Sequence, residues 1–193
     1  MADDKNRCSW CMGDADMMRY HDKEWGTPLK NNRKLFEFLI LDGAQAGLSW
    51  LTILKRREGY RAAFDGFDPE KIARYGAKDI TRLLKDKRII RNRLKIHSVI
   101  GNARAYIEME ESGTSLSKWL WNFADGKPIV NHWKTLAEIP PSTELSERIS
   151  KELKKKGFNF VGPTIVYSFM QAAGMVNDHL IDCYRWSAVQ AKR

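Results

Sequence analysis

The stretch from Gly157 to Cys183 is the part of this chain that most narrows its possible folds. Three lysines precede Gly157, as expected for the end of a helix, and glycine readily terminates one. Gly162 and Pro163 then favour a new helix, because proline suits the first helical position. The pattern predicts two helices joined by a tight turn, whose exposed backbone amides suit an anion such as a DNA phosphate.

The same stretch ends with two potential metal ligands. His179 and Cys183 are four residues apart, which places them on one face of a short helix. Two ligands do not complete a tetrahedral zinc site, and further candidates lie near the N-terminus. Cys8 or Cys11, together with His21, would complete a Cys2His2 site that joins the two ends of the chain. A redox C-x-x-C pair is the alternative, which the lack of a βαβ pattern disfavours.

Helical patterns dominate the rest of the chain, and strand signals are weak. Residues 33–41 form a nearly all-apolar helix, residues 89–111 the longest helical pattern, and residues 143–156 a third helix. No repeat or long linker interrupts them, so the expected class is all-α. We expect one compact unit over residues 1–193, in which a metal-binding sub-region of about residues 1–30 and 175–193 packs on residues 31–174.

The charge balance favours a polyanionic partner. Lysine and arginine outnumber aspartate and glutamate by 33 to 24, a net charge of +9. A merely soluble basic protein is the simpler explanation of this charge. Apolar runs are too short to cross a membrane, and the N-terminus lacks an apolar signal core, so a cytoplasmic protein is expected. In that compartment three cysteines indicate metal ligands or free thiols.

Asp42 is a single carboxylate between an apolar helical pattern and Trp50. Capping of the preceding helix is the simpler interpretation of this residue. A functional role is the alternative, because a lone carboxylate in such a setting is notable.

The chain resembles the 3-methyladenine DNA glycosylase I family, one of the helix-hairpin-helix DNA glycosylases. The similarity extends over nearly the whole chain, in several blocks that occur in the same order. The blocks are Cys8 with Trp10, Tyr20 to Gly26, Leu35 to Glu37, Gln45 to Trp50, Gly101 to Ala105, Gly157 to Gly162, and Asn177 to His179.

The resemblance implies a monomeric, monofunctional base-excision repair enzyme that hydrolyses the N-glycosidic bond of 3-methyladenine in damaged double-stranded DNA. It also implies one structural Zn²⁺ and selects Cys8 over Cys11 as a ligand. The implied residues fall into four groups: the zinc ligands Cys8, His21, His179 and Cys183; the catalytic residues Asp42, Tyr20 and Trp50; the further base-pocket residues Trp10, Met17 and Trp25; and the DNA contacts Gly47, Leu48, Gly157, Gly162 and Thr164.

Two positions depart from the family pattern. The family usually has glutamate at the position of Asp42, and tyrosine is common at the position of Met17. Aspartate is one methylene shorter, about 1.5 Å of reach, so its contact with a base would need a bridging water or a shifted backbone. The alternative function is therefore a zinc-containing DNA-binding protein of the same fold, with an altered substrate or no catalysis.

Overall fold

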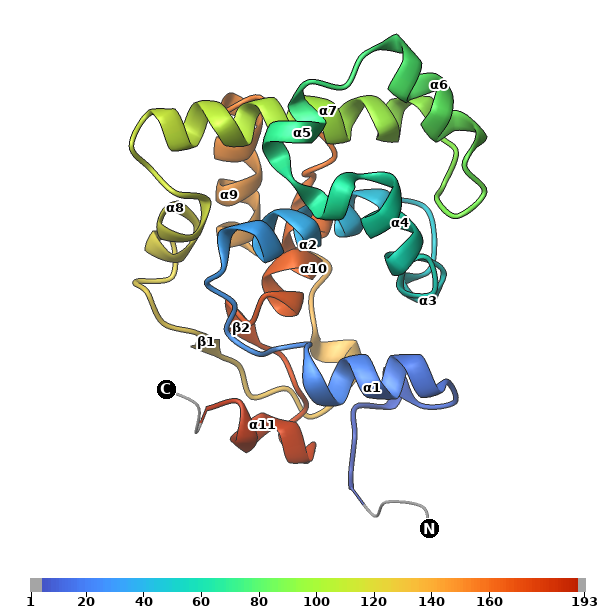
Figure 1. The fold of residues 1–193 in the computed structure, drawn as a ribbon. Helices are drawn as coiled ribbons and strands as arrows, with labels where there is room; N and C mark the ends of the chain where they lie inside the picture. The colour runs from blue at the N-terminus through green and yellow to red at the C-terminus, as the bar shows by residue number, and fades with distance from the viewer. Residues whose placement is uncertain (1–4, 191–193) are drawn as a thin grey trace.

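The computed structural model describes residues 5–190, and its regular secondary structure is almost all helical (Figure 1), which confirms the all-α class. Its strands, β1 and β2, form only a two-residue parallel pair, with Ile129 opposite Val176. The elements are η1 Ser9–Cys11, α1 Ala15–Lys23, α2 Asn32–Gln45, α3 Trp50–Leu54, α4 Arg57–Ala63, η2 Asp65–Phe67, α5 Pro69–Ala73, α6 Ala77–Lys85, α7 Arg93–Glu111, α8 Leu116–Asn122, β1 Ile129–Val130, η3 Leu136–Glu138, α9 Glu144–Lys155, α10 Pro163–Ala172, β2 Val176–Asn177 and α11 Tyr184–Ala188.

Helix α2 lies at the centre of the molecule, in contact with α3, α7, α8 and α10 (Figure 1). Residues 35–44 of this helix are all buried, as expected for a helix that is apolar on nearly every side. It begins after Asn31, whose side chain caps the helix by accepting a hydrogen bond from the Lys34 amide at 3.0 Å.

The predicted end of α2 at residues 42–43 is wrong, because the helix continues to Gln45. Gly43 packs against Phe160, and a Cβ atom at Gly43 would lie only 3.2 Å from that residue. The small residue therefore allows α2 to pass closely under the α9–α10 turn. Asp42 consequently lies inside the helix, and the capping interpretation of this residue is also wrong.

Helices α9 and α10 are joined by the predicted tight turn. Gly157 adopts a φ of +88° just after α9, and Pro163 is the first residue of α10. Asn102 of α7 fixes the turn from inside, since its side chain exchanges hydrogen bonds of 3.0 and 2.7 Å with the backbone of Asn159. This turn is therefore a rigid part of the protein surface.

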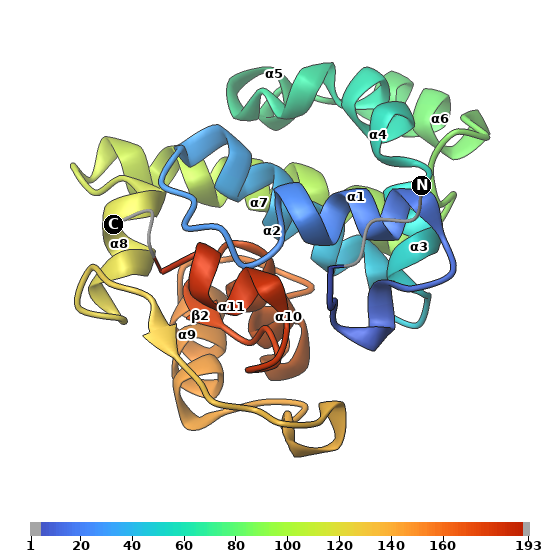
Figure 2. The same ribbon diagram turned by 90° about the horizontal axis from the view of Figure 1, so that it is seen from below.

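The N-terminal segment, α1 and α11 lie at one end of the molecule, and α5, α6 and α7 lie at the other (Figures 1 and 2). The helix predicted to carry His179 and Cys183 is absent, since these residues lie in the irregular connection between β2 and α11. The Asn177 side chain accepts a hydrogen bond from the His179 amide at 3.3 Å, a local contact that competes with helix formation. Cys183 instead caps α11, where its sulfur accepts from the Arg185 amide at 3.4 Å.

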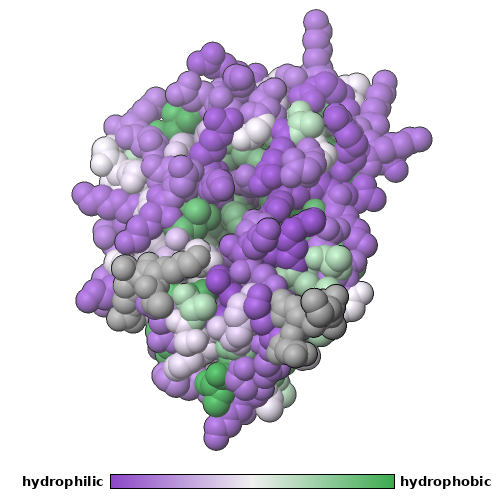
Figure 3. All heavy atoms as spheres, turned by 60° about the horizontal axis from the view of Figure 1, so that its bottom comes forward, coloured by the Kyte–Doolittle hydropathy of each residue, from purple (hydrophilic) through white to green (hydrophobic). Residues whose placement is uncertain are grey.

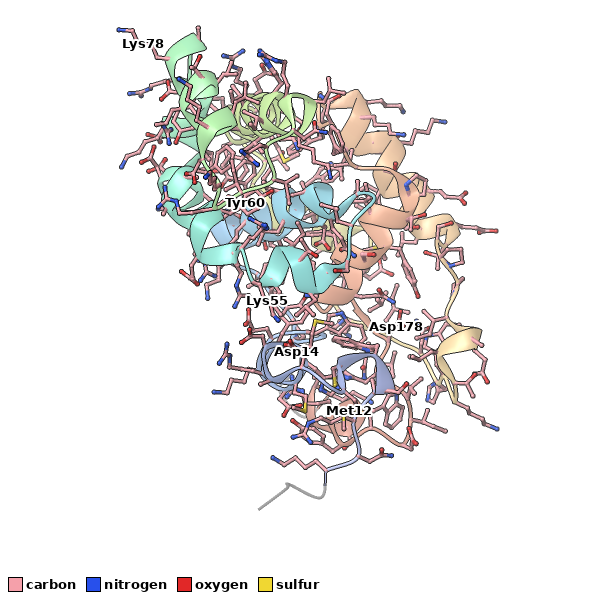
Figure 4. The ribbon with its side chains drawn as sticks, turned by 90° about the vertical axis from the view of Figure 1, so that its right-hand side faces the viewer. Met12, Asp14, Lys55, Tyr60, Lys78 and Asp178 are labelled. Carbon is pink, nitrogen blue, oxygen red and sulfur yellow. The ribbon has the colours of Figure 1, made fainter. Side chains whose placement is uncertain are left out.

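Two ion pairs hold α1 against the helices α3 and α4. Lys55 Nζ lies 2.9 Å from Asp14 Oδ2, and Figure 4 shows both side chains at the boundary between these helices. Arg57 makes a two-pronged contact with Glu24, at 2.7 and 2.9 Å. These contacts position α1, which contributes one wall of the cavity described below.

The face of the molecule seen in Figure 3 is mostly hydrophilic, with small separate apolar patches. Among residues 5–190, no helix combines the length and the apolar character that crossing a membrane requires.

Candidate active site and metal centre

A cavity of about 200 Å³ lies between α1, α2 and α10. It brings together every residue that the sequence suggested for base binding or catalysis, although these residues come from distant parts of the chain. Its lining consists of Trp10, Met17, Tyr20, Trp25, Asp42, Gln45, Trp50, Ile139, Ser168, Gln171 and Ala172.

Aromatic rings form most of the cavity wall. Tyr20 and Trp50 lie 5.2 Å apart between ring centroids, and Trp10 and Trp25 lie 5.0 Å apart in an edge-to-face arrangement. Trp10 and Trp50 are only half-buried, so part of each ring is free to contact a ligand. Such walls suit a flat ring, and a cationic ring especially, because aromatic faces attract positive charge.

Asp42 is the polar centre of the cavity. Its side chain is 3 % exposed, and its Oδ2 has no hydrogen-bond partner among the described residues. Burial raises the pKa of the Asp42 carboxyl well above its usual range. The buried indole N–H of Trp50 likewise has no hydrogen-bond partner within residues 5–190. Two unsatisfied buried polar groups in one cavity are uncommon in folded proteins and indicate a site for a polar ligand.

A second, open hollow of about 320 Å³ adjoins the cavity and shares Asp42, Gln45 and Ser168 with it. It connects the cavity to the α2–α3 loop and to the start of α10. Of the predicted DNA contacts, Gly47, Leu48 and Thr164 line this hollow, whereas Gly157 and Gly162 lie in and beside the α9–α10 turn.

The α2–α3 loop presents Leu48 to solvent with 39 % of its surface exposed. Lys95 holds the base of this loop, since its Nζ donates hydrogen bonds to the carbonyl groups of Ala44 and Ala46 at 2.8 and 2.7 Å. The ammonium group of Lys95 is therefore used inside the protein rather than on its surface.

The four predicted metal ligands form one buried cluster, in which all ligand atoms lie within 4.8 Å of one another. The Cys183 sulfur is 3.4 Å from His21 Nε2, and His179 Nδ1 is 3.7 Å from the sulfurs of both Cys8 and Cys183. A tetrahedral zinc ion with sulfur and nitrogen ligands separates its neighbouring ligand atoms by about 3.3–3.8 Å. The three contacts match these separations, and the widest pairs, up to 4.8 Å apart, would move closer by about 1 Å around a bound Zn²⁺.

The surroundings of the cluster orient its two histidines. The second ring nitrogen of His21 contacts Asp22 at 2.8 Å, and that of His179 contacts the Trp25 carbonyl at 3.2 Å. Such contacts typically direct the other ring nitrogen toward a metal. A hydrogen bond from the Cys8 thiol, with further ones from the histidines, lowers the pKa of Cys183, whereas the same hydrogen bond and burial raise the pKa of Cys8. The cluster therefore favours a thiolate at Cys183.

Two neighbouring residues do not belong to the cluster. Cys11 is buried, and its thiol donates a hydrogen bond to the Cys8 carbonyl at 3.1 Å. Asp178 precedes the ligand His179, but its carboxylate contacts four side chains outside the cluster. Asp22 is the acid that contacts a histidine of the cluster.

The metal cluster and the aromatic cavity share a wall. The rings of Trp25 and His179 lie 4.6 Å apart, and those of Trp10 and His21 lie 5.4 Å apart. Gly26 makes this close approach possible, because a Cβ atom there would lie 2.8 Å from His179 Nε2. A disturbance of the cluster would therefore displace the cavity wall.

The family model for methyladenine glycosylases matches residues 10–186. The chain belongs to this family. It is therefore an enzyme of the glycosylase class.

Relatives of known structure and name agree with this assignment. The glycosylase is 52 % identical to DNA-3-methyladenine glycosylase 1 of Escherichia coli strain K12, over 92 % of this chain and 95 % of the relative. A crystal structure of 3-methyladenine DNA glycosylase I has a TM-score of 0.91 at 51 % identity, covering 93 % of this chain and 98 % of the other. A crystal structure of a tyrosine-to-phenylalanine variant of 3-methyladenine DNA glycosylase I, in complex with 3-methyladenine, has a TM-score of 0.90 at 39 % identity. The match covers 93 % of this chain and 96 % of the other.

Five residues that line the cavity of this glycosylase were not singled out from the sequence. Ser168 and Gln171 continue a polar row that begins at Thr164, with spacings of four and three residues on an otherwise apolar helix. This polar row on an apolar helix could have been used to predict that this face of the helix lines a functional site. Nothing in the local pattern distinguishes the other three, which are Gln45, Ile139 and Ala172.

Proposed function

We propose that this glycosylase hydrolyses the N-glycosidic bond of 3-methyladenine in alkylated double-stranded DNA, as a step of base-excision repair. The observation that carries the proposal is the buried, unpartnered carboxylate of Asp42 in an aromatic cavity. The complex of a structural relative with 3-methyladenine supports it. Action as a monomer stays part of this proposal.

The residues of the cavity suit a cationic base. Adenine methylated at N3 is already positively charged in DNA, so its release needs no strong acid to protonate the leaving group. The rings of Tyr20 and Trp50 would stabilise this charge by roughly 0.5–2 kcal/mol each. A nearby cation also favours the ionised form of Asp42, which can then accept hydrogen bonds from the exocyclic amine.

The reaction itself breaks the bond between the sugar C1′ and N9 of the base. The bonding electrons leave with the base, which becomes neutral, and a water molecule adds its oxygen to C1′ and loses a proton. Asp42 is assigned to base recognition rather than to activation of this water. Extraction of the base from the duplex costs a few kcal/mol, which the cavity contacts offset.

The enzyme is proposed to be monofunctional. Strand cleavage through a Schiff base requires an amine nucleophile, usually a lysine, near the sugar. No lysine is among the described residues that line the cavity. The ammonium group of Lys95, which lies behind the α2–α3 loop, is occupied by two backbone carbonyls. An intact strand with an abasic site is therefore the expected product.

The α9–α10 element is proposed as a helix-hairpin-helix motif that contacts the DNA backbone around Gly157, Gly162 and Thr164. Leu48, at the exposed tip of its loop, is proposed to fill the gap that the extruded nucleotide leaves. Leu48 and Thr164 both line the hollow that leads to Asp42. This arrangement supports entry of the base from that side.

Zn²⁺ is proposed as a structural ion held by Cys8, His21, His179 and Cys183. Four protein ligands complete a tetrahedron and leave no position for a catalytic water. Bound zinc would supply a fixed link between the N-terminal segment and the connection before α11. Residues 1–193 are still predicted to form one unit, and a zinc ion that joins the two ends of the chain would be consistent with this prediction.

Duplex binding is expected to weaken steeply with salt. Contacts to the phosphate backbone release counterions, so affinity falls by roughly 10³–10⁵ between 50 and 200 mM salt when 6–10 phosphates are contacted. Titration of an abasic duplex at several salt concentrations measures the slope. An affinity that is insensitive to salt would contradict backbone contact as the basis of binding.

Replacement of Gly162 by valine is expected to weaken binding to an abasic duplex several-fold without unfolding the protein. The backbone of Gly162 has a φ of −62°, and no atom lies within 4 Å of a Cβ atom placed there, so the fold tolerates the side chain. A DNA phosphate that lies close to the backbone at this position would collide with the valine side chain. Fluorescence anisotropy with a labelled duplex gives the affinity.

Gly76→Val is the matched control for this variant. Gly76 has a φ of −115° and equal space around its Cβ position, but it lies in the α5–α6 connection. Its affinity should equal that of the wild type. Equal affinity in Gly162→Val as well would remove the α9–α10 turn from the proposed contact surface.

A further inference from the structure

The amide group of Gln171 is held in one orientation by a buried carboxylate. Asp178 is 1 % exposed, and its carboxylate accepts four hydrogen bonds. Its Oδ1 accepts from Asn131 at 2.6 Å and from Trp133 at 2.9 Å. Its Oδ2 accepts from the Tyr167 hydroxyl at 2.6 Å and from Gln171 Nε2 at 2.8 Å.

This network determines which end of the Gln171 amide faces the cavity. A carboxylate surrounded by donors can only accept hydrogen bonds, so Gln171 must turn its NH₂ group toward Asp178. Rotation of the amide by 180° would place two oxygens against each other inside the protein. The carbonyl oxygen of Gln171 is therefore directed away from Asp178.

That oxygen is available to a ligand. Gln171 lines the cavity from α10, whereas Asp42 lines it from α2. In the described structure, Gln171 Oε1 accepts no hydrogen bond, and it is not among the polar atoms that are sealed from solvent without a partner. The cavity thus holds two oxygen acceptors on different helices, the carboxyl group of Asp42 and the fixed amide oxygen of Gln171.

We infer that Gln171, oriented by Asp178, is a specificity-determining residue that selects 6-aminopurines over 6-oxopurines. The inference rests on the proposed function. Adenine carries an amine with two N–H donors at position 6, whereas guanine carries an acceptor oxygen there. Two acceptors in the cavity match the amine. A 6-oxo group would leave Gln171 Oε1 and the base oxygen facing each other unpaired, and Asp178 prevents the amide from turning to relieve this.

The test uses duplex DNA methylated so that it contains both 3-methyladenine and 3-methylguanine. The ratio of the two initial release rates is measured for the wild type and for Gln171→Met, which keeps the side-chain length and removes the amide. The ratio is expected to fall about tenfold, because a site built to bond one polar group loses its discrimination when that partner is removed. The fall should come mainly from slower release of 3-methyladenine.

Gln190→Met is the matched control. Gln190 lies after α11, where its amide donates to the Trp186 carbonyl at 2.8 Å. This variant carries the same replacement outside the cavity and should keep the wild-type ratio. A purely structural role for Gln171 predicts that both release rates fall together with the melting temperature. An unchanged ratio in Gln171→Met would therefore overturn the inference.

Gln171→Glu is a second variant that retains an oxygen acceptor. Its carboxyl group would share a proton with Asp178, since two adjacent carboxylates do not both ionise readily. It would then donate to Asp178 as the amide does and still present an oxygen to the cavity. Its ratio should lie closer to that of the wild type than the ratio of Gln171→Met does. A loss as large as that of the methionine variant would contradict the role of the acceptor.

Failure of the proposed function gives a different result. A wild-type enzyme that releases neither base would contradict the proposed reaction. The inference would then be decided by the affinities of free 3-methyladenine and 3-methylguanine, measured by quenching of tryptophan fluorescence. Preference for the amino base that disappears in Gln171→Met would support it, and a preference that persists would overturn it.

Discussion

Asp42→Asn is expected to slow release of 3-methyladenine by about 100-fold, because hydrogen bonds to charged groups contribute about 1.5–3 kcal/mol. The amide can neither oppose the positive charge of the base nor present two acceptor oxygens to it. Binding to an abasic duplex, which lacks the base, should stay close to that of the wild type. Single-turnover release assays and anisotropy titrations measure the two quantities separately.

Asp42→Glu is the control that keeps the charge. It restores the length common in the family, about 1.5 Å of additional reach, and the cavity of about 200 Å³ has room for one methylene group. Its release rate should equal or exceed that of the wild type. Equal activity in Asp42→Asn would contradict base recognition by this carboxylate.

The same asparagine variant is expected to be more stable than the wild type at neutral pH. Burial raises the folded-state pKa of Asp42 above its ordinary value of 3.8, so the folded protein holds this proton more tightly than the unfolded chain does. Stability from this group is therefore present below about pH 4 and is lost as the pH rises toward the folded-state pKa. Asparagine has no proton to lose.

Melting curves from pH 4 to pH 8 test this sign. The melting temperature of Asp42→Asn should exceed that of the wild type by an amount that grows with pH. A variant that is less stable at pH 8 would show that the carboxylate has a stabilising partner in the folded protein. Higher stability with lower activity would identify Asp42 as a group retained for function.

Cys183→Ala is expected to abolish tight zinc binding and lower the melting temperature by about 8–16 °C. A ligand present at 1,000 times its dissociation constant contributes about 4.1 kcal/mol, and each kcal/mol corresponds to about 2–4 °C in a protein of this size. Base release should fall as well, because Trp10 and Trp25 contact histidines of the cluster. Metal analysis, calorimetry and the release assay measure the three effects.

Cys11→Ala provides the comparison for this variant. Cys11 is also buried, but its sulfur lies outside the cluster. One zinc per chain should remain bound to it, with a much smaller loss of stability. Full zinc content in Cys183→Ala, or its loss in Cys11→Ala, would show that the ligand set is wrong.

Several helix starts could be predicted from the sequence because they depend on local contacts, but the longest helix, expected from residue 89, begins only at Arg93 after the Asn92 cap. Asn31, Ser115 and Thr143 each cap a helix through hydrogen bonds within three residues. The end of α2 could not be predicted, because the role of Gly43 depends on Phe160, which is distant in the chain. The turn that holds His179 and Cys183 was likewise missed, since spacings of four residues also occur in irregular segments.

The candidate site was predictable only in part. Resemblance to a family supplied the aromatic residues, Asp42 and the four cluster residues, and the structure brings each of these groups together. It did not supply the orientation of Gln171, which depends on Asp178 and on further donors from residues 131–133 and from α10 itself. Such a network forms only in the folded chain, so spacing in the sequence does not reveal it.

The central claim is that Asp42 recognises 3-methyladenine for excision, and analysis by mass spectrometry of bases released from methylated duplex DNA tests it most directly. The wild-type enzyme should release free 3-methyladenine and leave intact strands with abasic sites, whereas Asp42→Asn should release it about 100-fold more slowly, the effect of losing about 1.5–3 kcal/mol. Absence of released 3-methyladenine from wild-type protein that retains zinc and binds the duplex would contradict the claim.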